Sequence, residues 1–586
     1  WQADFQYEIG KNHARYFDEE GWLYFTREVF DLFYPSYGDT YPLFHGAIGM
    51  THEQAGHSRA GQAIIMNNED TLTLMDRINH HLTTALSNVE IASENADRLI
   101  ENFGAYFNDS KNNPPGAYKT FIIKGDNPEG RIRALTSLLD KNHIQYGRIK
   151  SGTSLKAYDY ISGKETTVEV NNNDLVISAY QPLGLYAQVL MEPKSELEDS
   201  VTYDITAWSL PYAYGLTAYA SKQKVEVEKG YEFSTYTSSR TLPKAYAYLS
   251  QWESMEDVKF LSAVLKEGIK VRYATGMFEL EGKSYQPGTL IITRADNRKL
   301  NTDFDQISRK IAYETEQELE AVQTGLSTKG SDLGSGTMTL IQTPKIVLVS
   351  GEGTNPSSFG QMWYYFEQDI TYPVSIITKD QLPGFDLNDY NLLIMSDGWF
   401  NFSDAELDKL SNWISGGGRL IAIGAALNGF KDKPGFKLTE FATDAEKSEA
   451  RKAEEEEELA ARLNHYSGQE RRWASNAIPG AIFKLNLDNT HPLGYGMDDH
   501  YFTLKTGRGR YNLLKDAWNV GTIGEELMIS GFAGSRIKEQ LKNTVVFAVQ
   551  DKGRGAVTYM VDNPLYRGFW ENGKFLFSNA VFLVGQ

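Results

Sequence analysis

The apolar and polar positions of this chain alternate between helical and strand-like periods along most of its length. Residues 7–20 and 71–107 carry apolar side chains at steps of three and four, which predicts a short and a long helix. The glycine-flanked stretch 46–56 between them reads as a short buried strand. The run NDSKNNPPGA after residue 107 interrupts the helical pattern, so a domain boundary is expected near residue 110.

Residues 117–300 contain an internal repeat. Each of its two units reads strand, helix, strand, strand, and the units begin at TFIIKG and AYAYLS. In the two predicted helices, Leu135, Leu139 and Ile144 align with Leu261, Leu265 and Ile269. The repeat predicts two related α/β units that pack together. Residues 301–343 read as a polar helix followed by a Gly/Ser/Thr-rich linker.

Residues 345–586 show a different strand pattern. KIVLVS, NLLIMSDG and RLIAIGAA are continuous apolar runs that end in small residues, as parallel strands buried on both faces do. Ser403 and Glu406 form a capping box that predicts the start of a helix. The insertion 440–475, with five consecutive glutamates at 454–458, reads as a solvated helix. The expected fold is therefore α/β, with regions 1–110, 111–343 and 344–586.

The amino-acid composition argues against several classes of function. The 586 residues include 58 basic and 77 acidic ones, a net charge of −19, which argues against a partner with a phosphate backbone. No apolar run approaches the ~18 residues of a membrane span. Cysteine is absent, so thiolate metal ligands, disulfides and cysteine nucleophiles are excluded. The chain starts at Trp1, and we expect a fragment or a processed product.

Candidate chemistry centres on the segment HEQAGH. Its two histidines, His52 and His57, are five positions apart, whereas the helical zinc motif needs a separation of four. Glu53 follows an apolar, glycine-flanked stretch, so partial desolvation would suit it to general base catalysis. The alternative for Glu53 is an ion pair with Arg59 or another basic residue.

Two further features have less specific interpretations. GEGTNPSSFG follows a predicted strand, and we favour a tight turn at the carboxyl edge of a sheet over a phosphate loop. Trp208 and Trp570 have the chemistry to stack on a sugar or a peptide, but packing in the core or between domains is the favoured interpretation.

The segment FYPSYGDTYPLFHGAIGMTHEQAG resembles the last third of the catalytic domain of zinc carboxypeptidases, the family of pancreatic carboxypeptidase A. Tyr34 matches that family's tyrosine on a mobile loop, and Glu53 matches its catalytic glutamate. The predicted helix with Leu74 to Phe103 matches the closing helix of that domain. Tyr37 and Tyr41, in the same segment, are assigned to substrate binding by this resemblance. It also extends through DITAWSLP and NPLYRGFWENGKFLFSNA to essentially the whole chain.

The resemblance implies hydrolysis at the C-terminus of a peptide substrate by a zinc-bound water, with Glu53 as general base and Tyr34 stabilising the substrate or the tetrahedral intermediate. In that family the zinc ligands, an H-x-x-E pair and a later histidine, lie upstream of this segment. None of the ten histidines here is followed three residues later by Glu. Zinc is therefore expected in the full-length protein and not in this chain. The family also implies a secreted or periplasmic location.

Residues 344–586 are similar to a class I glutamine amidotransferase-like domain of the flavodoxin-like type. That resemblance places the nucleophilic cysteine of such enzymes near Gly424, and the chain has no cysteine. His491 and His500 therefore have no cysteine nucleophile to activate as bases. The leading hypothesis is the C-terminal portion of a metallocarboxypeptidase-like protein, inactive by itself. The alternative is a non-catalytic scaffold that binds a ligand or a partner.

Overall fold

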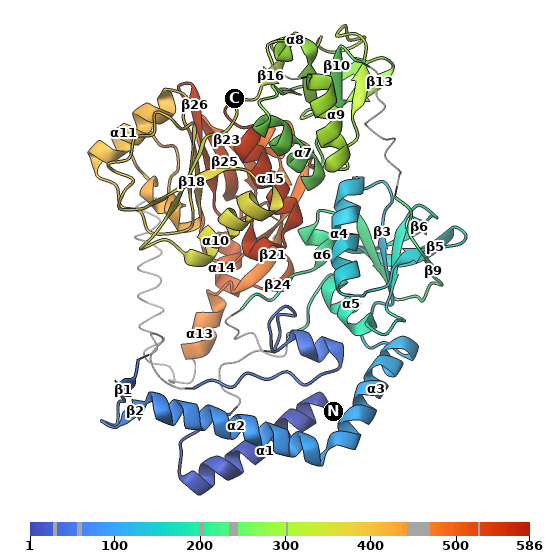
Figure 1. Cartoon of the computed structure of the whole chain (residues 1–586), viewed down its shortest axis with the longest axis vertical. Coiled ribbons are helices and arrows are strands. Elements are labelled where there is room, and N and C mark those ends of the chain that lie inside the picture. The colour runs from blue at the N-terminus through green and yellow to red at the C-terminus, as the bar shows by residue number, and fades with distance from the viewer. Residues whose placement is uncertain are drawn as a thin grey trace.

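A computed structural model describes residues 1–26, 32–54, 61–197, 204–233, 244–300, 303–441, 469–525 and 528–586. His57, Arg59 and the glutamate run 454–458 lie outside these residues. The described chain forms a helical N-terminal region, two small mixed units and one large sheet (Figure 1). The predicted α/β class is therefore confirmed.

Three helices dominate the N-terminal region. Helix α1 (Gln2–Glu20) packs against α2 (Leu74–Glu94), and α3 (Ala96–Asn112) continues beyond a break at Asn95. The expected single helix 71–107 is thus two helices. The Asn95 amide donates to the carbonyl of Ile91 at 2.9 Å, a side-chain bond that competes with the backbone ladder. The remaining elements are η1 (Tyr41–His45) and a hairpin of β1 (Ala63–Ile65) and β2 (Thr71–Thr73).

The apolar side of α2 faces solvent in this chain. Five aliphatic residues at helical spacing, here called the α2 stripe, are 48–68% exposed, although such side chains are usually buried. The capping box of Thr73 with Asp76 fixes the start of the helix, so the stripe belongs to a well-defined element. The α2 stripe consists of Leu74, Ile78, Leu82, Leu86 and Val89.

The two middle units share a series of five strands, and the relation between them that the sequence predicts stays a prediction. The strand order is β6–β5–β8–β3–β7–β4–β9 in the first unit and β15–β10–β14–β11–β16 in the second, so the series from β8 to β9 corresponds to the whole second sheet. Every neighbouring pair in both series is antiparallel. All six aligned side chains are buried: the four leucines lie on α4 and α7, and the two isoleucines follow the ends of these helices.

The first unit comprises β3 (Thr120–Ile123), α4 (Glu129–Lys141), β4 (Gly147–Arg148), β5 (Thr153–Asp159), β6 (Lys164–Val170), β7 (Leu175–Ser178), α5 (Gly184–Met191), α6 (Leu210–Ala213), β8 (Ala218–Ser221) and β9 (Glu228–Lys229). The second comprises β10 (Ala247–Ser250), α7 (Met255–Lys266), β11 (Arg272–Ala274), β12 (Phe278–Leu280), β13 (Lys283–Tyr285), β14 (Leu290–Thr293), α8 (Arg294–Asn297), α9 (Phe304–Glu314), β15 (Glu320–Val322) and β16 (Met338–Leu340). The expected linker before residue 343 therefore contributes the edge strand β16, which pairs with β11.

The C-terminal sheet contains a flavodoxin-like half. Its parallel strands β17, β18, β19, β20 and β26 lie in the order β18–β17–β19–β20–β26, which is 2-1-3-4-5 in chain order. Beyond β26 the sheet continues antiparallel. Its strands are β17 (Ile346–Ser350), β18 (Val374–Thr378), β19 (Leu392–Met395), β20 (Arg419–Ile423), β21 (Gly480–Leu487), β22 (His500–Lys505), β23 (Trp518–Thr522), β24 (Met528–Phe532), β25 (Val545–Lys552) and β26 (Gly555–Met560).

Short helices cover this sheet: α10 (Pro356–Tyr364), η3 (Tyr365–Asp369), α11 (Asp404–Ser415), η4 (Gly424–Gly429), α13 (Gln469–Ser475), η6 (Pro492–Gly494), α14 (Ser535–Gln540), η7 (Tyr566–Gly568) and α15 (Glu571–Phe582). Helix α11 begins with the predicted Ser403–Glu406 capping box. No described helix has the length and apolar character that a membrane crossing requires.

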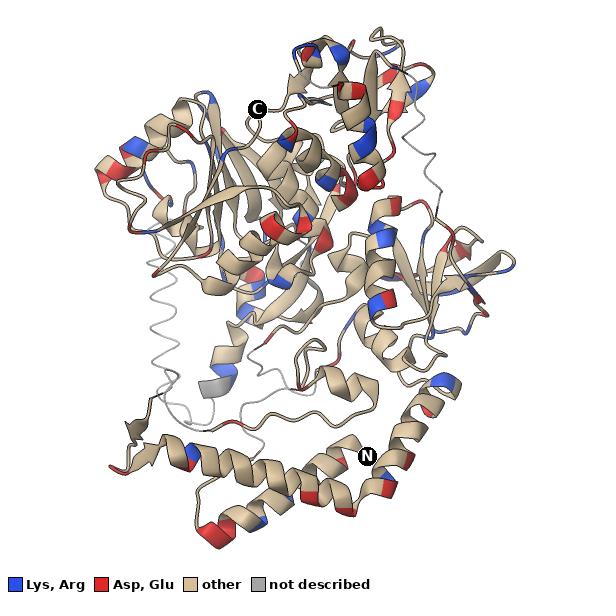
Figure 2. Ribbon diagram, viewed as in Figure 1, with Lys and Arg blue, Asp and Glu red and all other residues tan. Residues whose placement is uncertain are grey.

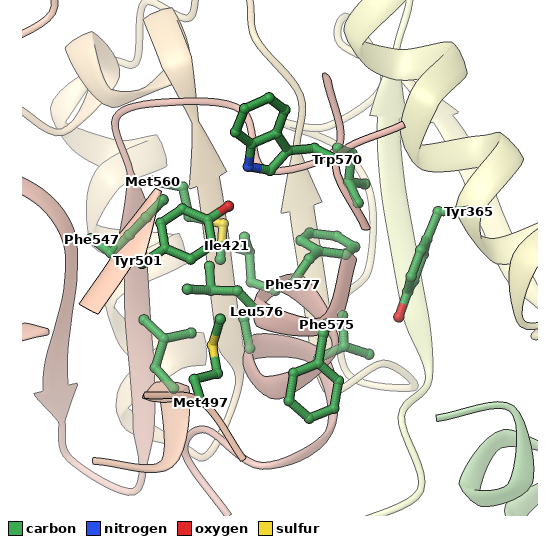
Figure 3. Close-up of a cluster of buried hydrophobic side chains, with 14 of the residues drawn as sticks. Tyr365, Ile421, Met497, Tyr501, Phe547, Met560, Trp570, Phe575, Leu576 and Phe577 are labelled. Carbon is green, nitrogen blue, oxygen red and sulfur yellow. The ribbon is translucent and has the colours of Figure 1, made fainter. Parts of the chain in front are cut away.

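Helix α15 lies at the centre of the core. All of its residues from Asn572 to Phe582 are buried, as expected for a helix that is apolar around most of its circumference. Figure 3 shows Phe575, Leu576 and Phe577 packed among aromatic and sulfur-containing side chains from several strands. Its buried Asn579 accepts a hydrogen bond from Trp252 Nε1 at 2.6 Å, which ties the second middle unit to the C-terminal region.

Arg131 provides a second link between regions. This buried guanidinium on α4 donates to three backbone carbonyls, those of Gly215 at 3.0 Å, Glu253 at 2.9 Å and Gly496 at 2.7 Å. These acceptors belong to the first unit, the second unit and the C-terminal region. One side chain thus holds three parts of the molecule together.

Candidate functional site

Glu53 lies in an irregular segment with its side chain exposed to solvent. The strand expected over residues 46–56 is wrong for the described part, since residues 46–54 form turns and coil. Instead of pairing with a sheet, the segment is held by its side chains. Gln54 Oε1 accepts a hydrogen bond at 2.7 Å from His80 Nδ1 on α2, so the residue next to Glu53 is anchored on that helix.

The residue before Glu53 is anchored on α1. His52 Nε2 lies 3.2 Å from His13 Nε2, and His13 Nδ1 lies 2.9 Å from Ser87 Oγ of α2. Burial, and then the neighbouring His52, lower the pKa of His13 to about 4. Burial, and then His81, lower the pKa of His52. Both imidazoles are therefore neutral at pH 7, and Glu53 extends outward from a rigidly held neighbour.

Tyr34 and Tyr37 are drawn together by Arg567. The Arg567 guanidinium lies over the Tyr34 ring at 4.6 Å and donates to Tyr37 Oη at 2.9 Å and to Asp204 Oδ1 at 2.8 Å. Asp204 is buried, and Tyr34 also packs edge-on against Trp208. These residues form what we call the Arg567 cluster: Tyr34, Tyr37, Asp204, Trp208 and Arg567.

Burial shapes the chemistry of the two tyrosines. It is the main reason that the pKa of Tyr34 is raised and that the pKa of Tyr37 is raised to about 12. Both phenols are therefore protonated at neutral pH. With only 7% of its surface exposed, Tyr34 has to leave the cluster before it can touch a substrate.

Tyr41 lies apart from that cluster. Its hydroxyl donates to Asn142 Oδ1 at 3.2 Å, and its ring contacts His45 in a tilted arrangement with centroids 4.1 Å apart. The four predicted site residues thus occupy three places: the Arg567 cluster, the contact with Asn142 and the exposed position of Glu53. The structure brings Tyr34 and Tyr37 together, and their catalytic and binding roles stay predictions.

A zinc ligand set is not formed by the residues that the structure describes. Within those ranges there is no group of three or more His, Cys, Asp or Glu side chains with the geometry to hold a metal ion. The His13–His52 pair supplies two nitrogens only. The described residues therefore do not fit the zinc that the family resemblance implies.

The carboxyl edge of the flavodoxin-like sheet is organised by Asp397, which follows β19. Asp397 Oδ1 accepts from the Ala425 backbone N–H at 2.7 Å, and Oδ2 accepts from the Asn355 amide at 3.3 Å. The strand order reverses between β17 and β19 at this edge, where open α/β sheets bind ligands. Trp399, also at this edge, is 69% exposed.

Gly424 stands at this edge, where the family resemblance places the nucleophile of an amidotransferase. It follows β20 with a φ of +60°, and a Cβ atom there would lie 2.6 Å from Asp397 Oδ1. A side chain at this position would have to displace the Asp397 carboxylate. The two tryptophans named as stacking candidates, Trp208 and Trp570, are both buried, which confirms the packing interpretation.

Sequence reasoning missed Arg567, Asp204 and Asp397 as organising residues. Arg567 has a non-helical conformation with a φ of +50°. The local sequence signal for it is the glycine that follows, Gly568. Its partners are more than 350 positions away in the chain, so no local pattern identifies them. Asp397 stands directly after an apolar run, and that position at a sheet edge is a usable signal.

No model of a protein family matches this chain, and no curated protein sequence matches it. Among solved structures, a ThuA-like protein from Bacteroides uniformis is 14% identical over 40% of this chain and 89% of its own, with a TM-score of 0.25. A glutamine amidotransferase from Thermotoga maritima is 8% identical over 41% of this chain and 96% of its own, also with a TM-score of 0.25. A β-galactosidase from Bacillus circulans sp. alkalophilus is 11% identical over 40% of this chain and 30% of its own, with a TM-score of 0.24. At these TM-scores the fold assignment rests on the strand order described above.

Proposed function

We propose that this chain is the C-terminal portion of a metallocarboxypeptidase-like protein that removes residues from the C-terminus of peptides. The observation that supports the proposal is the exposed α2 stripe. Five large aliphatic side chains on one face of a capped helix form the surface that a helix normally buries against a sheet. In the family that the sequence resembles, this helix closes the catalytic domain, and the rest of that domain is its natural cover.

In this proposal Glu53 is the general base. Its exposure leaves it open to the upstream half of the domain, and the anchors of His52 and Gln54 on α1 and α2 limit its movement. Tyr34, Tyr37 and Tyr41 contact the substrate, Tyr34 after release from the Arg567 cluster. Zinc belongs to residues upstream of Trp1, and the chain by itself is inactive.

The test uses the longer polypeptide encoded by the native gene. We expect its intact mass to exceed 66.0 kDa. We also expect it to bind zinc and to release the C-terminal residue of an N-terminally blocked dipeptide. Glu53→Gln should lower kcat by at least about a hundredfold, the scale of general base catalysis, and leave the zinc content unchanged. Glu94→Gln, an exposed change on α2, is the matched control and should retain full activity.

Two outcomes contradict the proposal. One is a native protein with the mass of this chain. The other is a longer protein whose hydrolysis is unaffected by Glu53→Gln.

The second candidate function is a non-catalytic scaffold that binds a ligand at the flavodoxin-like edge. The specific observation in its favour is the Asp397 network at the reversal of strand order, beside the exposed Trp399. Asp397→Ala together with Trp399→Ala should then abolish retention of the ligand, measured by mass spectrometry of the native protein. Hydrolysis by the longer polypeptide should be unaffected, which separates the two candidates.

A further inference from the structure

A cavity of about 480 Å³ lies in the C-terminal region, where β21 begins and β22 ends. One wall is the segment 476–479, which leads from α13 into β21, and the other is the segment 506–508, which follows β22. Strands β21 and β22 pair antiparallel, with Ala481 opposite Lys505, so the two segments leave the sheet side by side. The strand pairing therefore fixes how far apart the two walls lie.

Backbone contacts hold the first wall in place. The Asn476 N–H donates to the carbonyl of Trp473 at 3.0 Å, and the Ala477 carbonyl accepts from the Gly534 N–H at 2.9 Å. A Cβ atom on Gly534 would lie 2.1 Å from the carbonyl oxygen of Ser475, so this contact with the loop before α14 requires glycine. The wall is preformed, and a ligand does not have to order it.

Much of the lining is apolar. The side chain of Trp473 is 55% exposed, and Ala477, Ile478 and Pro479 continue the apolar surface into the cavity. An exposed tryptophan at such a cavity is typical of a surface that buries an apolar group of a partner. The volume is in the range of small-molecule sites, so a large side chain fits inside.

Three polar side chains line the same cavity, those of Asn476, Thr506 and Arg508. Within the described residues, none of the three makes a side-chain hydrogen bond or an ion pair. Arg508 is exposed, and a Cβ atom on the neighbouring Gly507 would meet no atom within 4 Å, so the approach to this arginine is open. The polar groups of the cavity are therefore available to a ligand.

The charge at this cavity is opposite to that of the whole chain. The chain has a net charge of −19, yet the described residues that line the cavity include an arginine and no carboxylate. Helix α13 adds Arg471 and Arg472, neither of which has an ion pair within the described part of the chain, and Figure 2 shows basic residues in blue on this helix. Positive charge beside an apolar surface favours a ligand that has both an anionic and an apolar group.

We propose that this cavity binds the C-terminal residue of a peptide partner, where that residue has a large apolar side chain. Its α-carboxylate pairs with Arg508, its side chain packs on Trp473 in the cavity, and its peptide group hydrogen-bonds to Asn476. A carboxamide donates and accepts, as a peptide group does, which favours a peptide over a fatty acid. The site is built from elements that carry neither Glu53 nor the Arg567 cluster, so it does not rest on the proposed carboxypeptidase function.

The experiment is calorimetric titration of the whole chain at low salt with the peptide acetyl-Ala-Ala-Phe. The same peptide as a C-terminal amide, acetyl-Ala-Ala-Gly and octanoate are separate arms. We expect the amide and the glycine peptide each to bind about tenfold more weakly, because one lacks the charge and the other the apolar side chain. Arg508→Gln should weaken binding of the acid about tenfold and leave binding of the amide unchanged, whereas Trp473→Ala should weaken both. Both side chains are exposed, so both variants should fold.

The matched controls are Arg298→Gln, at an exposed arginine of the second middle unit, and Trp363→Ala, at an exposed tryptophan of α10. Neither should change the affinity for the acid. Equal affinity for the acid and the amide overturns the proposal, as does equal affinity of the wild type and Arg508→Gln. The absence of binding at millimolar peptide overturns it too. Tighter binding of octanoate than of the acid peptide would assign the cavity to fatty acids and would also overturn the proposal.

Discussion

Single side chains connect segments of this molecule that lie far apart in the sequence. Arg131 donates to carbonyls of three regions, and Arg567 connects the N-terminal loop to Asp204 across more than 350 positions. The buried Arg131 guanidinium is costly to disrupt, because each lost bond leaves a backbone carbonyl unsatisfied. At this scale stability depends on a few polar contacts as well as on the apolar core.

Arg131→Met is therefore expected to lower the free energy of unfolding by about 3 kcal/mol, since three buried carbonyls lose their donor. Urea unfolding followed by tryptophan fluorescence measures the change. Arg148→Met removes an exposed arginine with a single 4.0 Å ion pair and should cost less than about 0.5 kcal/mol. Equal effects of the two variants would show that the Arg131 contacts do not couple the regions.

Several helices and strands were predictable because local sequence patterns determine them. Periodicity and capping predicted a helix over 7–20, which the structure has as Gln2–Glu20. They also predicted the α4 and α7 pair with its buried leucines, the capping box at Ser403 and the parallel strands. The stretch 46–54 was not, because glycines and apolar residues there fit a strand while side-chain anchors to α1 and α2 hold it as coil. Of the candidate site, the sequence indicated the segment but not the burial of Tyr34, which depends on Arg567.

The contact between α1, α2 and the segment of Glu53 predicts that the stability of the N-terminal region depends on pH. His13 and His52 have lowered pKa values, so they favour the folded state fully above about pH 6.5. That contribution is lost as the pH falls from 6.5 towards 4, because the unfolded state then binds protons that the folded state does not. We expect the N-terminal region to lose about 1–2 kcal/mol over this range.

Hydrogen exchange of residues 1–26 and 74–94 at pH 7.5 and pH 4.5 measures this loss. His13→Gln should flatten the dependence, whereas His143→Gln, outside the contact, should leave it as in the wild type. If hydrogen exchange depends on pH equally in the wild type and in both variants, the His13–His52 pair is not the origin of the dependence.

The whole molecule presents two contrasting surfaces. The C-terminal sheet is closed around α15, whereas the N-terminal helices expose the α2 stripe. Contiguous apolar surface of this kind promotes association. Leu82→Glu with Leu86→Lys replaces two stripe residues by a favourable i,i+4 ion pair and should therefore reduce self-association of this chain.

Sedimentation velocity at several concentrations measures that change. Glu101→Lys with Ala105→Glu makes a comparable exchange at exposed positions of α3 and should have little effect. In the longer polypeptide, where the stripe is proposed to be covered, the Leu82/Leu86 variant should instead lower the melting temperature. An unchanged melting temperature there would mean that the stripe is not a domain interface.

The similar strand series of the two middle units has a consequence for how the interface between them can evolve. Equivalent helices meet at equivalent ends, so a single chain contains the arrangement that two identical subunits would otherwise form by association. A covalent tether gives such an interface an effective concentration in the millimolar range, so a weak contact suffices to keep it closed. Each half is then free to mutate independently, and a junction that began symmetric can acquire an asymmetric set of charges.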